Sequence, residues 1–123
     1  MADAIGARAE EHRRKRRQET IQNFKEHVNL TARQLERWLQ TEDSRSSGRR
    51  RAGASESIGH ESGRKIVGLL RKNTSEYDGK DLAHMRKVVG YIKRHLNQRP
   101  DGDITETRWR YSLMNWGHDP LKT

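Results

Sequence analysis

The sequence predicts an all-α fold, because its apolar residues recur at helical spacing and no segment alternates apolar and polar residues over a useful length. Between Leu82 and Leu96, five apolar residues follow one another at intervals of three and four, which places them on one side of a helix. Helix-capping residues precede several of the expected helices. We expect a small bundle of about three C-terminal helices and an N-terminal helical pair joined to it by a flexible basic linker.

The first helix is expected over residues 7–27, a stretch without Gly or Pro that is rich in helix formers. Its first turns are polar all round and contain the basic run 13–17. A nucleic-acid contact or a nuclear-targeting signal explains this run, and a solvated helix face explains it equally well. A turn then leads to a short second helix over residues 32–40, where Thr31 and Gln34 have the spacing of a capping box.

Residues 43–56 are expected to form a flexible linker, since they are rich in Ser, Gly and Arg and almost without apolar side chains. Three helices follow. The first covers residues 61–72. The second begins after Asp78, the N-cap, with Asp81 three residues further on. The third is short and is expected to be capped by Thr105.

These elements divide the chain into four parts. We expect a basic N-terminal segment over residues 1–19, a helical pair over 20–42, the linker over 43–56 and a helical core over 57–123. The core is placed in the last part because apolar spacing and capping signals agree there.

Composition indicates a basic protein. Lys and Arg number 26 against 17 Asp and Glu, which gives the 123-residue chain a formal net charge of +9. Such a charge attracts polyanions. The absence of cysteine excludes disulfides and thiolate metal sites, and no run approaches the ~20 apolar residues of a membrane span. We expect an intracellular protein without membrane contact, cytoplasmic or nucleoid-associated in a bacterium and nuclear in a eukaryote.

A nine-residue segment is nearly repeated further along the chain: residues 64–72 are RKIVGLLRK and residues 86–94 are RKVVGYIKR. In a helix, the basic residues lie three and four positions before and after the central glycine and therefore surround it on one face. We interpret these faces, with two arginines of the last helix, as the candidate nucleic-acid-binding surface. Its residues are Arg64, Lys65, Gly68, Arg71, Lys72, Arg86, Lys87, Gly90, Lys93, Arg94, Arg108 and Arg110.

Two explanations of the repeated glycines stay open. A glycine inside a helix costs about 1 kcal/mol relative to alanine, so each is expected to serve a purpose. Either an anionic ligand approaches the helix backbone at Gly68 and Gly90, or another helix crosses closely there. The two basic faces form one groove only if the two helices pack so that both faces lie side by side.

Nucleic acid is the ligand class that the basic faces favour, because phosphate contacts by Lys and Arg supply most non-specific affinity. We expect duplex DNA, favoured over RNA, to be bound mainly by its backbone and shape. Trp109 and Trp116 are seven positions apart and are expected in the core rather than as a base-stacking platform. The alternative function is a protein-interaction module that binds an acidic partner or self-associates through the same faces. The oligomeric state is left open.

An enzymatic interpretation depends on the histidines, above all His60, His84, His95 and His118. No pair of these has the i, i+4 or His-x-His spacing of a recognised metal motif. We therefore expect no catalytic residue, no metal site and no cofactor, and we expect that the protein is not an enzyme.

Three segments carry longer motifs: residues 57–67, residues 83–96 and residues 107–122, the last of which includes WRYSLMNWGHDP at 109–120. With them, roughly residues 20–122 resemble a domain-of-unknown-function family of small basic proteins. Members of this family are commonly labelled DNA-binding, so the resemblance implies the same ligand class. It supplies no catalytic residues.

Limited proteolysis tests the expected linker. Trypsin should cut first near Arg49–Arg51, because an exposed segment without regular packing reaches the extended conformation that a protease requires. Mass spectrometry of the early fragments identifies the cleavage site. An intact chain under conditions that digest other flexible linkers would contradict the expected organisation.

Overall fold

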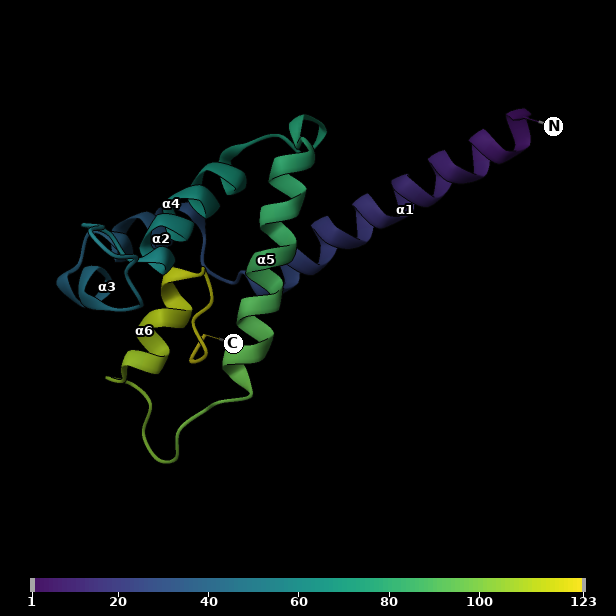
Figure 1. Cartoon of the computed structure of the whole chain (residues 1–123). Coiled ribbons are helices and arrows are strands. Elements are labelled where there is room, and N and C mark those ends of the chain that lie inside the picture. The colour runs from purple at the N-terminus through teal and green to yellow at the C-terminus, as the bar shows by residue number, and fades with distance from the viewer. Residues whose placement is uncertain (1, 123) are drawn as a thin grey trace.

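The computed structural model describes residues 2–122, and for residues 2 and 3 the backbone alone. Over this range the chain forms six α-helices and one short 3-10 helix and no strand, so the predicted all-α class is confirmed. Met1 and Thr123, the outer ends of the expected N-terminal segment and core, lie outside the described residues. The helices are α1 (Ala2–His27), α2 (Ala32–Leu39), α3 (Glu42–Ser46), α4 (Ile58–Arg71), η1 (Thr74–Glu76), α5 (Gly79–Leu96) and α6 (Arg108–Asn115) (Figure 1).

The N-terminal half of α1 projects away from the rest of the molecule (Figure 1). All side chains from residue 4 to residue 16 are exposed, whereas Ile21 and Phe24 near the other end of the helix are buried. Arg17 anchors α1 where it leaves the body, since its Nη2 donates to the carbonyl oxygens of Thr74 at 2.7 Å and Tyr77 at 3.3 Å. The basic run 13–17 therefore lies mostly on an exposed helix outside the core.

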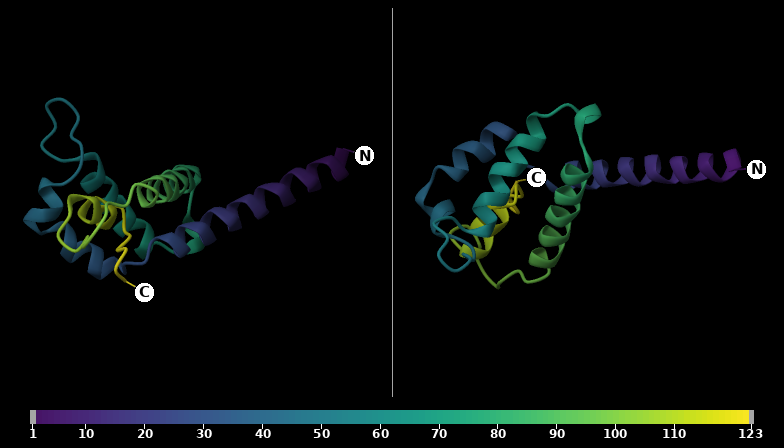
Figure 2. Two further views of the ribbon diagram at one scale, coloured as in Figure 1. Left: turned by 90° about the horizontal axis from the view of Figure 1, so that it is seen from below. Right: turned by 45° about the horizontal axis from the view of Figure 1, so that its top comes forward.

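One hydrophobic core unites the N-terminal and C-terminal helices. α1 packs against α5 and α2 packs against α4, while α6 contacts α2, α3, α4 and α5 (Figure 2). Phe24 and Leu35 are fully buried in the same cluster as Ile66, Met85 and Leu113. The core expected for residues 57–123 thus extends to the helical pair, which covers the apolar sides of α4 and α5.

The local capping signals are mostly confirmed. The expected capping box of Thr31 with Gln34 is present, and Asp78, the expected N-cap, also forms a capping box with Asp81; each precedes a helix. In both pairs the first side chain accepts from the backbone N–H of the second, and the second side chain accepts from the backbone N–H of the first.

Two helices begin at residues other than those expected. α4 starts at Ile58 rather than at residue 61, because the hydroxyl of Ser57 caps it by accepting from the N–H of His60 at 3.0 Å. The cap of α6 is Thr107. The expected cap, Thr105, is wrong, since its N–H and hydroxyl both bind the carboxylate of Asp103 in a local turn.

The first part of the expected linker is folded. α3 begins after Thr41, whose Oγ1 accepts from the N–H of Ser44 at 3.2 Å. Ser44 is buried, and its hydroxyl donates to Oδ1 of Asn115 at 2.5 Å while its carbonyl accepts from Nδ2 of Asn115 at 3.1 Å. The indole of Trp38 donates to the same Oδ1 at 2.8 Å. A buried amide at the end of α6 therefore fixes a segment whose composition alone indicates a loop.

The close helix approach occurs at Gly63 and not at the repeated glycines. A Cβ atom on Gly63 would lie 2.6 Å from the carbonyl oxygen of Asn115. Among the described residues, nothing lies within 4 Å of the equivalent position on Gly68, and on Gly90 the nearest group is the mobile guanidinium of Arg94 at 3.1 Å. The helix-crossing explanation of Gly68 and Gly90 is therefore wrong.

Substituting two glycines of α4 tests this assignment. Gly63→Ala should lower the free energy of unfolding by about 1–3 kcal/mol, because the added methyl group collides with a backbone oxygen that cannot move cheaply. Gly68→Ala is the matched control on the same helix and should raise it by up to ~1 kcal/mol, because the site is open and alanine favours the helix. Urea unfolding followed by circular dichroism measures both; equal shifts would contradict the assignment.

Candidate nucleic-acid interface

The arginines of the first repeated segment lie on the α2 side of α4 and are paired with carboxylates. Arg64 donates to Glu56 through Nε at 2.8 Å and Nη2 at 2.6 Å, and Arg71 donates to Glu36 at 2.6 Å. Planar guanidinium groups suit such bidentate pairing. Of these two members of the predicted site, Arg64 therefore holds the loop before α4 against that helix, and Arg71 holds α2 against it.

The lysines of the same segment line a groove between α4 and α5. The groove has a volume of about 680 Å³. Its carboxylate, Asp81, accepts from Nζ of Lys72 at 2.7 Å. Burial lowers the pKa of His84 in this groove, and the charges of Lys65 and Lys87 lower it further, so the surroundings disfavour an additional positive charge. The lining residues are Lys65, Gly68, Leu69, Lys72, Lys80, Asp81, Ala83, His84 and Lys87.

The basic residues of the second repeated segment are divided in the same way. Arg86 faces α1, with its Nη1 3.5 Å from the hydroxyl of Thr20. Lys93 lies seven residues further on and so shares that side of α5. Lys87 and Arg94 instead line a second cavity at the beginning of α4. Each glycine-centred ring is thus split between two sides of its helix.

The second cavity adjoins the groove through Lys87, which lines both. It has a volume of about 460 Å³, and its lining contains four cationic side chains and no carboxylate. The lining residues are Gly48, Arg49, Arg51, Ile58, Gly59, Lys87, Tyr91, Arg94, Ser112, Asn115 and Trp116. We refer to the cations of the two hollows together as the basic groove: Arg49, Arg51, Lys65, Lys72, Lys80, Lys87 and Arg94.

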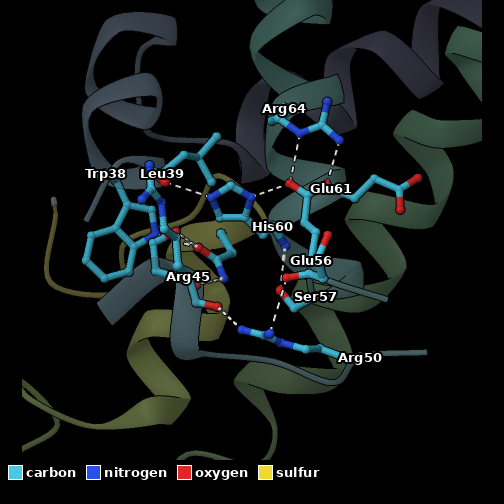
Figure 3. Close-up of polar contacts among 12 residues, drawn as sticks. Trp38, Leu39, Arg45, Arg50, Glu56, Ser57, His60, Glu61 and Arg64 are labelled. Carbon is cyan, nitrogen blue, oxygen red and sulfur yellow. Dashed lines mark hydrogen bonds and ion pairs between the residues drawn. The ribbon is translucent and has the colours of Figure 1, made fainter. Parts of the chain in front are cut away.

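Arg50 holds the loop that contributes Arg49 and Arg51 (Figure 3). Its guanidinium donates to the carbonyl oxygen of Arg45 at 2.8 Å and to that of Ser55 at 3.2 Å. Arg49 and Arg51, the residues on either side of Arg50, line the second cavity. The sequence-based site omitted Arg49, Arg51 and also Lys80; the only sequence signal for the two arginines is the run of three.

Glu56 and His60 form a polar cluster behind this loop (Figure 3). Nδ1 of His60 contacts the carboxylate of Glu56, and Nε2 lies 2.7 Å from the carbonyl oxygen of Leu39. The hydrogen bonds from Arg64, and those from His60, lower the pKa of Glu56 from 4.5 to about 2. The cluster therefore joins the end of α2, the loop and the first turns of α4.

The other histidines of the expected set also contact neighbouring segments. Nε2 of His84 lies 3.0 Å from the hydroxyl of Ser62, and Nε2 of His95 lies 3.0 Å from the carbonyl oxygen of Trp109. Nδ1 of His118 lies 2.6 Å from a carbonyl oxygen at the end of α1. Over residues 2–122, no three His, Asp or Glu side chains are grouped so that they could hold a metal ion.

No helix in that range has the length and apolar character that crossing a membrane requires.

The two arginines of α6 differ in their surroundings. Arg108 is exposed. Arg110 is partly buried and holds the carboxylate of Asp119 through Nε and Nη2, each at 3.0 Å, while its Nη1 donates to the carbonyl oxygen of Thr105 at 2.8 Å. Arg110 is expected from the sequence to extend the outward basic surface. Instead its side chain binds Asp119 and so holds the C-terminal segment against α6.

The aromatic rings stack on one another. The ring centroids of Tyr91 and Trp116 are 4.2 Å apart, those of Tyr91 and His95 are 5.2 Å apart, and those of His95 and Trp109 are 5.8 Å apart. Trp116 is buried and also stacks on His84 at 6.3 Å. The rings occupy each other's faces, which agrees with the expectation that the tryptophans pack inside the protein.

These features define a small, basic, all-helical protein with a cationic groove. A family model described as "Protein of unknown function (DUF3140)" matches residues 23–114, and the chain belongs to this family. The resemblance to a domain-of-unknown-function family is thereby confirmed, although the match stops before the closing residues 115–122. The family description names no ligand, and DNA binding stays a prediction. No curated protein and no solved structure matches the chain.

The acid stability of the protein tests the Glu56 cluster. The pKa of Glu56 is about 2 in the folded state against 4.5 ordinarily, so its stabilising effect is complete above about pH 4.5 and is lost as the pH falls toward 2. Glu56→Gln should therefore lower the melting temperature at pH 7, and the difference from the wild type should vanish near pH 2. Glu10→Gln, on the exposed part of α1, is the control. An equal difference at both pH values would contradict the ion-pair assignment.

Proposed function

We propose that the protein binds duplex DNA through the basic groove, with recognition mainly of backbone and shape. The observation that supports this most directly is the gathering of cations from three separate segments, the loop 49–51, α4 and α5, along two adjoining hollows. Phosphate contacts made by such cations release counterions and supply sequence-independent affinity. Helices hold most of these side chains, so the surface is largely preorganised.

The acidic residues near the groove leave it cationic. Asp81 engages Lys72. Glu61 lies 3.5 Å from Arg51 and 3.4 Å from Lys65; the two basic side chains are well exposed to solvent and Glu61 is partly exposed. Exposed pairs of this kind contribute at most about 1 kcal/mol, so a phosphate can replace the carboxylate at little cost.

Sequence readout has little support in the groove. Direct readout uses amide or guanidinium side chains aimed at base edges. Asn115 is the amide side chain in the lining, and its Oδ1 and Nδ2 are engaged by Trp38 and Ser44 inside the protein. The four lysines of the groove suit phosphate oxygens, which carry no direct sequence information, and any preference for a base would come from Arg49, Arg51 or Arg94.

An acidic protein partner is the second candidate, since the same cations would attract carboxylates. Competition against a bound duplex separates the two candidates. If the protein binds DNA, excess duplex of unrelated sequence should displace the bound duplex, whereas an acidic polypeptide of equal charge should not. Nuclease treatment of the purified protein adds an independent check, because copurified nucleic acid lowers its absorbance ratio when digested.

Fluorescence anisotropy with labelled duplexes of unrelated sequence tests the proposal. If about six phosphates are neutralised, log Kd should change with log salt concentration with a slope of magnitude near 5. Lys87→Gln should weaken binding severalfold and lower that slope by about 1, because Lys87 lies where the two hollows meet.

Lys93→Gln is the matched control, the same substitution on the α1 side of the same helix, and should have a smaller effect. Equal losses of affinity in the two variants would show that the net charge of the protein, and not the basic groove, determines duplex binding. Absence of binding at low salt would contradict the proposal and favour the acidic partner.

A further inference from the structure

The first turn of α4 lies at the second cavity, the smaller of the two hollows, which Ile58 and Gly59 line. The N–H of Ile58 donates to the carbonyl oxygen of Arg49 at 2.8 Å, and the N–H of His60 donates to the hydroxyl of Ser57 at 3.0 Å. Within residues 2–122, the N–H of Gly59 between them has no acceptor. An unsatisfied N–H at the start of a 14-residue helix attracts an anion through both its hydrogen and the helix dipole.

A second donor lies at the same place. Trp116 is only 4% exposed, and its Nε1 is 3.0 Å from the position that a Cβ on Gly59 would take. The indoles of Trp38 and Trp109 donate to Asn115 and His95, whereas that of Trp116 has no acceptor among residues 2–122. In that range every side-chain nitrogen or oxygen closed off from solvent has a partner, so Nε1 of Trp116 is open to solvent, and Trp116 is one of the residues that line the cavity. An acceptor that enters the cavity can bind this N–H in place of water.

The charge around these two donors is positive. Arg49, Arg51, Lys87 and Arg94 line the cavity, and no carboxylate does. A phosphate monoester carries about −1.5 to −2 charges at pH 7 and presents three acceptor oxygens. A backbone phosphodiester carries one charge and has a sugar on each side, which suits the larger and more open groove better than the smaller cavity.

We infer that this cavity binds a phosphate monoester, with the N–H of Gly59 and the indole N–H of Trp116 as donors and the four cations as counter-charges. Two sources present this group: the phosphorylated end of a nucleic-acid strand and a free nucleotide. The inference rests on the proposed function only for the first source.

Proton–nitrogen correlation spectra of the three indole N–H groups test the site directly. Adenosine 5′-monophosphate and inorganic phosphate should shift the Trp116 signal in a saturable manner and leave those of Trp38 and Trp109 in place. Sodium chloride at equal ionic strength is the control. No shift, or equal shifts of all three signals that chloride reproduces, would overturn the inference.

Variants of exposed arginines supply a test that does not depend on altering the core. Arg94→Gln should weaken adenosine 5′-monophosphate binding by about tenfold, as expected for loss of a charge-assisted hydrogen bond. Arg86→Gln, on the α1 side of the same helix, is the matched control and should change the affinity little. Equal losses would overturn the site. Trp116→Phe assigns the indole signal if the variant folds; otherwise Trp38→Phe and Trp109→Phe assign it by elimination.

Duplexes with phosphorylated and unphosphorylated ends distinguish the sources. Tighter binding of the phosphorylated duplex, lost in Arg94→Gln, supports a strand end; equal binding together with a Trp116 shift by the nucleotide supports a free nucleotide. Duplex binding without any Trp116 response to phosphate overturns the cavity site and leaves the proposed function intact. A Trp116 response without duplex binding supports the site and overturns the proposed function.

Discussion

The approach of α4 to the end of α6 at Gly63 and Asn115 is the constraint on which the rest of the structure depends. The space that a side chain on residue 63 would fill is occupied by the backbone of Asn115 and by Leu39, so α2, α4 and α6 meet there. The buried Asn115 amide satisfies Trp38 and Ser44 at the same point. A small residue thus permits the contact, and a fully bonded polar group specifies its geometry, because an unpaired amide in this position would be costly.

This contact also builds the candidate site. Asn115 is followed by Trp116, whose indole reaches the first turn of α4, and the anchoring of α3 fixes the start of the loop that carries Arg49 and Arg51. Hydrogen bonds from Arg50 fix the same loop further along. The cations of the smaller cavity come from the loop and from α5, two segments that meet where α6 packs against α3, α4 and α5.

The arrangement of charges separates structural cations from those offered to a ligand. Arg64, Arg71 and Arg110 each close on a carboxylate, and these pairs hold neighbouring segments in place. Lys65, Lys72 and Lys87 of the repeated segments line the groove instead. The basic residues of a repeated segment thus serve two purposes, some in structural ion pairs and some as groove cations, according to the side of the helix on which they lie.

The sequence by itself determined the all-α class, most helix positions, the caps at Thr31 and Asp78 and the cationic character, because these follow from residues close together in the chain. It also identified the repeated glycines, of which Gly68 is open and Gly90 is approached by the guanidinium of Arg94 rather than by another helix. It did not determine which residues of each ring share a surface. α4 packs on α2 and α5 packs on α1, so the two sides of each helix meet different neighbours. Only tertiary packing decided that Arg64 and Arg86 turn away from the groove, that Arg49 and Arg51 join it, and that Ser44 is buried, because each of these depends on contacts between residues distant in sequence.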